Sequence, residues 1–266
     1  MNDTELGLVS RGNDSRLLHD KVFQRQYFAQ VQRNYVDICS GSEVDTLRRT
    51  FMTVSISKSG HDSFEDGRAD LNKVILGLRK LREALLATRD RSEFAKEVLL
   101  FTVRVTTLLG HYESYIPAMK RLLEEDVVEL TSAERYEIGG LYVLHLAHFN
   151  NDLTAAYDAM LRHDLLDDLA LRQVLRAWDD CDYVLWRRRF ITEPDPGRHR
   201  MMAFGDTAIA VGSLKRIGRA YFFMQKTELE TLTGWPWQDC VDQLECGWRL
   251  EDSGRVVMRE RRSKVS

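Results

Sequence analysis

The stretch TELETLTGWPWQDCVDQLECGWRLEDSGRVVMRERRSKVS, residues 227–266, decides the fold of this chain. It opens with a helical pattern in which Thr227 is a candidate N-cap and Glu230 lies at the third helical position. In that arrangement each side chain satisfies the other residue's backbone N–H, which fixes the start of a helix. Gly234 then ends the helix, and a Trp-Pro-Trp connection follows, because the residue before a proline avoids the helical region.

A second short helix and a two-stranded ribbon complete this motif. The helix is predicted to run to about Cys246, where Gly247 can supply a left-handed stop. Residues 248–251 and 255–259 are predicted strands on either side of Asp-Ser-Gly, a hairpin turn signal. Two helices across a short turn followed by a ribbon predict a winged helix. Winged helices bind nucleic acid or assemble proteins, and they seldom catalyse reactions.

The bulk properties exclude several classes of protein. The chain has 266 residues, of which 44% are hydrophobic and 30% charged, as in a helix-rich globular protein. Its net charge of −3 provides no global basic field for nucleic acid. The sequence shows no secretory signal and no apolar stretch that would span a bilayer. We expect a cytoplasmic or nuclear protein with reduced thiols at its four scattered cysteines: Cys39, Cys181, Cys240 and Cys246.

The first 91 residues match no pattern that identifies a role. Residues 16–39 and 70–88 place apolar side chains at helical spacing, so each predicts an amphipathic helix. Residues 43–56 fit a helix or a strand, with a helix favoured. Residues 57–68 have the composition of a loop.

A rhythm of paired helices begins at residue 92. Ser92 is a plausible first cap, and Thr131 with Glu134 forms a capping box. The pairs start roughly 35 to 40 residues apart, which is the period of helix-hairpin solenoids of the right-handed, TPR-like kind. The predicted helices are 93–110, 113–125, 132–149, 152–163, 167–177 and 180–190.

The segment Glu193-Pro-Asp-Pro-Gly197 is the strongest helix breaker in the chain, so we place the boundary with the closing module within it. Helices over 202–212 and 213–224 are then predicted to lead into the winged helix. The expected organisation is an N-terminal helical region at 1–91, a helical-repeat part at 92–195, a winged helix at 196–262 and a tail at 263–266.

No motif predicts catalysis or a cofactor. Phosphate-binding glycine loops and the nucleophile elbow G-x-S-x-G are absent. His145 and His148 lie three residues apart and could bind zinc together, but no further ligand has diagnostic spacing. We expect one of them to pack in a helix interface and the other to be solvated. Close helix packing accounts for the glycines of the 202–224 region: Gly205, Gly212 and Gly218.

The second helix of the predicted winged helix argues against reading of DNA. A recognition helix presents Arg, Lys, Asn or Gln to the major groove. Residues 238–246 contain Asp239, Asp242 and Glu245 and no basic side chain, so this helix would repel phosphates. Base stacking is one interpretation of the nearby tryptophans, but the core of a small module is the stronger one for Trp235, Trp237 and Trp248.

The final strand is the best candidate for a protein interface. An exposed strand edge pairs readily with a strand of another chain, although a closing strand with a solvated edge fits the pattern equally. The candidate interface residues are Arg255, Val256, Val257, Met258 and Arg259. A basic rim beyond them could touch an RNA backbone through Arg259, Arg261, Arg262 and Lys264. A further basic run at 187–189 is expected to pair with neighbouring acids.

Three segments carry a resemblance to the PCI family. Residues 138–161, IGGLYVLHLAHFNNDLTAAYDAML, look like the central helix pair of that family. Residues 175–190, LRAWDDCDYVLWRRRF, look like a second pair, with Asp-Cys-Asp-Tyr where the family has a small residue or Gly-Asn before an aromatic. Residues 229–260 look like its winged helix, with a Gly-Trp pair opening the ribbon. The resemblance is greatest to the small PCI subunits of the proteasome lid, the COP-nine signalosome and initiation factor three (subunit k type).

The resemblance implies a non-catalytic scaffold. Family members assemble through their winged helices, so the implied partners are other helical-repeat subunits of a large complex, with no membrane and no small-molecule substrate. The Sac-three/GANP branch shares the architecture and implies an alternative, an RNA-associated adaptor in mRNA export, processing or translation initiation. Only four residues follow Arg262, so by this resemblance we expect the long C-terminal bundle helix of several family members to be missing.

Overall fold

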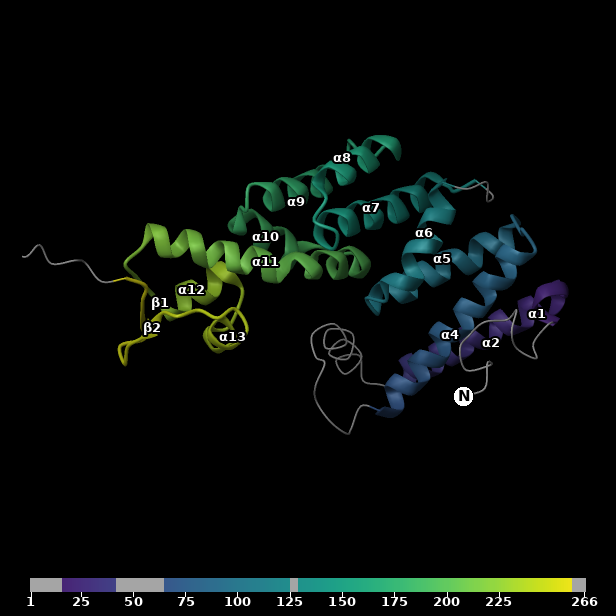
Figure 1. Cartoon of the computed structure of the whole chain (residues 1–266), viewed down its shortest axis with the longest axis horizontal. Coiled ribbons are helices and arrows are strands. Elements are labelled where there is room, and N and C mark those ends of the chain that lie inside the picture. Colours follow the sequence, from purple (N-terminus) through teal and green to yellow (C-terminus); the bar gives the residue numbers. More distant parts are fainter. Residues whose placement is uncertain (1–15, 42–64, 125–128, 260–266) are drawn as a thin grey trace, which may run out of the picture. The chain divides into compact units, whose positions relative to one another are not determined.

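The computed structural model describes residues 16–41, 65–124 and 129–259 (Figure 1). The chain is mainly helical, with one small three-stranded sheet near its C-terminal end. It divides into two compact units, residues 1–139 and 140–266, each of which is described by itself. The domain boundaries predicted at residues 92 and 196 stay predictions.

The first unit is built of antiparallel helices. Its elements are α1 (Arg16–His19), α2 (Lys21–Gly41), α4 (Glu65–Ala87), α5 (Glu93–Leu108), α6 (Tyr112–Glu124) and the start of α7 (Ser132–His148). The helix predicted at 70–88 is confirmed, and the one predicted at 16–39 is confirmed as helical but is divided at Asp20 into α1 and α2. The prediction for 43–56 lies outside the described residues, and the predicted loop at 57–68 is wrong over its last four residues, which belong to α4.

One hydrophobic core joins the N-terminal helices to α5. Leu17 of α1, Phe28 of α2 and Leu78 of α4 are buried in the same cluster as Phe94 and Val98 of α5. The helices on either side of residue 92 therefore bury their apolar faces in one shared core.

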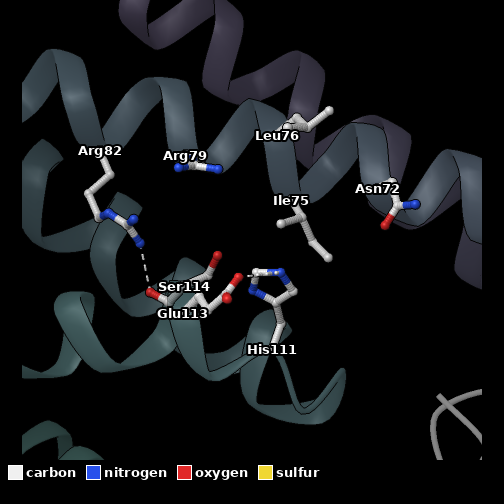
Figure 2. Close-up of a pocket in the computed structure, with 8 residues that line it drawn as sticks. All are labelled: Asn72, Ile75, Leu76, Arg79, Arg82, His111, Glu113 and Ser114. Atoms are coloured by element: carbon white, nitrogen blue, oxygen red, sulfur yellow. Dashed lines mark hydrogen bonds and ion pairs between the residues drawn. The ribbon is translucent and has the colours of Figure 1, made fainter. Parts of the chain in front are cut away.

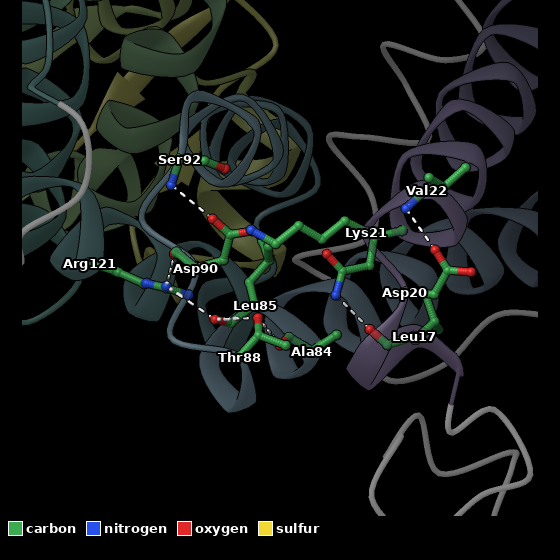
Figure 3. A network of polar contacts seen from close by, with 11 residues as sticks. Leu17, Asp20, Lys21, Val22, Ala84, Leu85, Thr88, Asp90, Ser92 and Arg121 are labelled. Atoms are coloured by element: carbon green, nitrogen blue, oxygen red, sulfur yellow. Dashed lines mark hydrogen bonds and ion pairs between the residues drawn. The ribbon is translucent and has the colours of Figure 1, made fainter.

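A buried polar network surrounds the turn between α4 and α5 (Figure 3). The Asp90 carboxylate accepts the Ser92 N–H at 2.9 Å and lies 3.6 Å from the Lys21 ammonium, and Arg121 of α6 donates to the Asp90 carbonyl at 2.7 Å. Burial alone would raise the pKa of Asp90, but the Ser92 hydrogen bonds and Lys21 outweigh it and hold that pKa below its usual value. The network links α2, the turn and α6.

Two helix caps are predicted in this unit, and the structure shows the capping hydrogen bonds of one of them. Thr131 and Glu134 form the predicted capping box: the Thr131 N–H donates to the Glu134 carboxylate at 2.8 Å, and the Glu134 N–H donates to the Thr131 hydroxyl at 3.2 Å. Ser92 does occupy the N-cap position of α5, but its side chain makes no capping bond.

The second unit contains four helices that each begin with an aspartate cap. They are α8 (Leu153–Arg162), α9 (Leu169–Asp179), α10 (Tyr183–Thr192) and α11 (Pro196–Ala220). In each, the aspartate before the helix accepts a backbone N–H at 2.7–3.0 Å, which satisfies a donor that the helix leaves unpaired. These caps are Asp152, Asp168, Asp182 and Asp195.

The helix α11 corrects the prediction of two helices at 202–212 and 213–224. It runs without a break from Pro196 to Ala220, through Gly212 and Ser213. The Ser213 hydroxyl bonds back to the Ile209 carbonyl at 2.6 Å, and a Cβ at Gly212 would overlap the Cys181 sulfur. Residues 223 and 224, predicted as the end of the second helix, belong instead to the strand formed by residues 223–225.

The glycines of α11 serve close packing, as predicted. A Cβ at Gly205 would lie 2.5 Å from the Trp178 ring, and one at Gly218 would lie 2.8 Å from the Trp248 ring. Each glycine thus lets a tryptophan lie against the helix backbone.

After α11 come β1 (Phe223–Gln225), α12 (Lys226–Thr233), α13 (Trp237–Asp242), β2 (Arg249–Leu250) and β3 (Arg255–Val257) (Figure 1). The strands form an antiparallel sheet in the order β1-β3-β2. Met224 and Val256 of the sheet share a buried core with Leu229 of α12, Cys240 of α13 and Ile217 of α11.

Within the described ranges, no helix is both long and apolar enough to cross a membrane.

Several local predictions for residues 227–254 need correction. Gln225, and not Thr227, precedes α12, and the Glu230 carboxylate accepts the Trp237 N–H at 2.8 Å. The second helix ends at Asp242, and the left-handed residue after it is Glu245 (φ 53°), where Gly247 was expected. The predicted stop at Gly234 and the turn at Gly254 are confirmed, since both are left-handed with φ of 76° and 77°.

Candidate protein-interaction surface

The two faces of the small sheet differ in burial. Directly opposed residues of antiparallel strands point to the same face. Met224, Val256 and Leu250 form one row, and the first two are buried against α11 and α12. The next row, Phe223, Val257 and Arg249, therefore points to the other face of the sheet, together with Gln225 and Arg255.

This outer face combines aromatic, aliphatic and guanidinium groups. Phe223 is 54% exposed, and the Arg255 guanidinium lies 4.5 Å from the centre of its ring, a cation–π distance. Arg255 also donates to the Glu251 carboxylate at 3.1 Å, which holds the guanidinium over the ring. Val257 is half-buried between Phe223 and Arg249. Arginine and large aromatic residues are enriched in protein interfaces. The composition of the outer face therefore favours a protein interface over a purely structural role for the final strand.

A second aromatic–arginine pair lies directly before β1, next to the end of the sheet. Arg259 lies 4.4 Å from the centre of the Phe222 ring and donates to the Arg219 carbonyl at 2.8 Å. Tyr221, Phe222 and Phe223 are all partly exposed, at 47%, 36% and 54%. We call Tyr221, Phe222, Phe223, Arg249, Arg255, Val257 and Arg259 the sheet surface.

The expectation that the final strand offers a free edge is wrong. β3 lies between β1 and β2, so both of its edges are already paired. Of the candidate interface residues, Val256 is fully buried and Met258 packs against the same core, whereas Arg255, Val257 and Arg259 belong to the sheet surface. The free edges of the sheet belong to β1 and β2. Arg261, Arg262 and Lys264 lie outside the described residues.

Sequence reasoning missed the contribution of β1. Tyr221, Phe222 and Phe223 continue the apolar pattern of the preceding helix, so their spacing gives no sign of a strand. A run of three aromatic residues directly before a helix cap was the available signal, because aromatic residues are enriched in strands.

The tryptophans of this unit support the core, as predicted. Trp237 is buried, and Trp235 and Trp248 pack against the same cluster. The indole N–H groups of Trp235 and Trp186 donate to the two oxygens of Asp206, at 3.0 and 3.2 Å. These rings hold α10, α11 and the turn before α13 together, so they do not form a base-stacking platform.

The acidic character of α13 is retained in the structure. Asp239 and Asp242 accept hydrogen bonds from Gln243 and Gln238 on the same helix, at 3.2 and 2.9 Å. Glu245 is exposed just beyond it. The helix α13 itself contains no basic side chain that would neutralise these carboxylates. This is consistent with a helix that does not enter a DNA groove.

The two histidines of α7 are both buried, so the expectation of one solvated histidine is wrong. His145 stacks on Phe149, and His148 lies against Trp178 and Trp186 with Nδ1 3.3 Å from the Met201 carbonyl. Burial lowers the pKa of His148 from 6.5 to about 3, against a smaller opposing effect of the Met201 carbonyl. Across the ranges that the structure describes, no cluster of three metal-ligating side chains occurs.

The basic run at 187–189 also has a structural role. A Cβ at Gly234 would overlap the Arg187 guanidinium, which also lies 5.8 Å from the Phe190 ring centre. Arg189 donates to the Gln173 side chain. The prediction that this run pairs with acidic residues is therefore wrong for these two arginines, which contact backbone, ring and amide groups instead.

No known protein family model matches this chain, and its sequence matches no curated protein.

Proposed function

We propose that this chain is a non-catalytic scaffold subunit of the PCI type, part of a multi-subunit assembly such as the proteasome regulatory lid or a signalosome-like complex. The sheet surface is the observation that carries the proposal. It offers exposed aromatic rings and arginines on a rigid module whose other face is buried, and such side chains dominate binding energy in protein interfaces.

The order of elements supports a winged helix at the C-terminal end. A helix, a strand, two helices and two strands follow one another as α11, β1, α12, α13, β2 and β3, and the last strand lies in the middle of the sheet. That order is the one expected of a winged helix whose wing is the β2–β3 hairpin.

Helix hairpins support the repeat part of the proposal. α5 packs against α6 and α9 packs against α10, each pair joined by a short connection. Aspartate caps set where α8, α9 and α10 begin. Stacked hairpins of this kind are the repeating units of a solenoid. A non-membrane, cytoplasmic or nuclear location and helical-repeat partners belong to this proposal.

The test is the composition of the native assembly. Tagged chain purified from its own cell is expected to bring down helical-repeat partners at fixed stoichiometry, measured by mass spectrometry of the intact complex. The double variant Phe223→Ala/Arg255→Glu is expected to release them, because loss of an interface hot spot costs about 2 kcal/mol or more, roughly 30-fold in affinity. A proline at Val257 is a poor probe, since it would break the central strand.

Leu161→Asp is the matched control, because Leu161 is 63% exposed on α8, outside the sheet surface. It is expected to retain the partners. Recovery of a lone monomer from the native cell, or equal loss of partners in both variants, would refute the scaffold assignment.

A second candidate function, an RNA-associated adaptor, is favoured by the same aromatic–arginine pairs. Aromatic rings beside arginines bind single-stranded RNA by stacking and by contact with phosphates. Phe222 and Phe223 with Arg259 and Arg255 would supply such contacts, extended by the basic tail. Crosslinking to RNA through these residues, with affinity that falls as salt is raised, would support the adaptor. Absence of crosslinks at low salt would eliminate it.

A further inference from the structure

A polar hollow of about 410 Å³ lies between α4 and the start of α6 in the first unit (Figure 2). Both helices belong to residues 1–139, far in sequence from the sheet surface. Its lining is Asn72, Ile75, Leu76, Arg79, Arg82, His111, Glu113 and Ser114. Positions 72, 75, 76, 79 and 82 follow helical spacing, so one face of α4 supplies most of the wall.

Two arginines of α4 bring positive charge to this hollow. Arg79 and Arg82 lie three residues apart on the same helix face, so their charges repel each other. Neither has a carboxylate within ion-pair distance in the described part of the chain. Burial, and then the charge of Arg79, lower the pKa of Arg82, as expected for a cation that lacks a counter-charge.

The Arg82 guanidinium is fixed in position before any ligand arrives. Its Nη1 donates to the Ser114 carbonyl at 2.8 Å, as the dashed line in Figure 2 shows. A guanidinium carries five N–H donors in a planar fork, so further donors remain for a ligand. An arginine held in this way loses little entropy on binding, and its fork matches the oxygens of a phosphate.

The opposite wall adds further hydrogen-bonding groups. The His111 ring lies below Ile75 in Figure 2, with Nε2 3.7 Å from the Glu113 carboxylate. Its Nδ1 is enclosed and accepts or donates no hydrogen bond among the described residues. Asn72 and Ser114 supply an amide and a hydroxyl. Ile75 and Leu76 give one side of the hollow an apolar wall.

Glu113 is the one acidic side chain of the lining, and it does not neutralise the arginines. It is 68% exposed, and its recorded partner is His111. An anion in the hollow would face two guanidinium groups and meet this carboxylate only at the rim. Removal of the Glu113 charge should therefore tighten the binding of an anion and weaken the binding of a cation.

We propose that this hollow, with Arg79 and Arg82 as its anchors, binds a phosphate group, carried by a small phosphorylated molecule or by a phosphorylated side chain. Its volume lies within the range of small-ligand pockets, and its polar groups converge beside an apolar wall as such pockets require. The hollow shares no residue with the sheet surface, so its binding of phosphate is independent of the proposed scaffold function.

The test is isothermal titration of the full-length chain with three probes: inorganic pyrophosphate, a phosphoserine peptide and the same peptide unphosphorylated. Binding of a phosphorylated probe with a Kd below about 1 mM is expected. A tighter Kd for pyrophosphate would identify a free ligand, and a tighter Kd for the phosphopeptide would identify a modified side chain. Equal binding of the unphosphorylated peptide, or no binding of any probe, would overturn the proposal.

Arg79→Gln is the decisive variant, because Arg79 is exposed and makes no hydrogen bond or ion pair with the described residues, so its loss should leave the fold intact. It is expected to weaken binding by roughly 10-fold or more, the value of a charged hydrogen bond. Arg33→Gln is the matched control, since Arg33 is an exposed arginine of α2 outside the hollow. Equal weakening by both variants, or weaker binding in Glu113→Gln, would show that the arginines do not form a phosphate site.

Discussion

The buried ion pair between Asp168 and Arg198 offers a sharp test of what holds the second unit together. One carboxylate oxygen of Asp168 caps α9 through the Leu171 N–H, at 2.9 Å. The other lies 2.8 Å from Nη1 of Arg198, and the two side chains are only 2% and 9% exposed. The Arg198 guanidinium lies directly over Gly140, where a Cβ would be 2.5 Å from it. One carboxylate thus joins α9 to the first turn of α11.

The size of the effect follows from these two roles. Removal of one partner of a buried ion pair costs about 3–5 kcal/mol, because the other charge stays buried without compensation. Loss of an aspartate N-cap costs about 1 kcal/mol more. Asp168→Ala should therefore reduce the free energy of unfolding by about 4–6 kcal/mol. Asp168→Asn, whose amide oxygen can still cap the helix, should lose only the ion-pair part.

Urea unfolding followed by tryptophan fluorescence is the assay, because all five tryptophans lie in the second unit. Asp152→Ala is the matched control: Asp152 caps α8 in the same way at 2.9 Å but is exposed and has no buried arginine beside it. It should cost about 1 kcal/mol. If Asp168→Ala is no more costly than Asp152→Ala, the ion pair does not stabilise the unit as argued.

The remaining predictions concern titration, packing and thiol reactivity in the same unit. Because the pKa of His148 is about 3 when folded and about 6.5 when unfolded, the unfolded chain binds one more proton between these values, so stability should fall as pH falls from 6.5 to 3. The slope should be about 1.4 kcal/mol per pH unit and should flatten in His148→Phe, as measured by denaturation at several pH values. Gly205→Ala should destabilise by about 1–3 kcal/mol, since its Cβ would overlap Trp178, whereas Gly247→Ala, with nothing within 4 Å, should not; thermal unfolding distinguishes the two. Burial raises the pKa of the Cys240 thiol to about 11, so Cys240 should resist a thiol reagent at pH 8 until the chain unfolds, and rapid labelling of the native protein would contradict its burial.

Much of the helical architecture follows from local sequence signals. The helices from 93 to 192 are observed within a few residues of their predicted bounds, because apolar spacing and polar caps act within single turns. The Thr131–Glu134 box is confirmed for the same reason. The aspartates before α8, α9, α10 and α11 are a further local signal, because each caps its helix in the structure.

The errors occur where distant contacts decide local structure. The sequence predicts a helix boundary at Gly212, but α11 continues through it, and the Cys181 sulfur occupies the space that a side chain at Gly212 would need. β1 is a strand only because β3, some thirty residues later, pairs with it. Arg79 and Arg82 share one face of α4 by their spacing, but nothing in the sequence relates His111 to them, and only the packing of α4 on α6 brings all three to one hollow.

The central position of β3 changes how a partner would engage this module. A partner strand can add to the sheet only beside β1 or β2, and β2 is just two residues long. In the antiparallel register, Met224 pairs with Val256 toward β3, so the backbone groups of Phe223 point away from the sheet. The same residue carries the exposed ring beneath Arg255. Strand addition at β1 and side-chain contact on the sheet surface therefore converge on Phe223. If the proposed assembly forms through this module, loss of the Phe223 side chain should weaken it more than a change at any residue of β3.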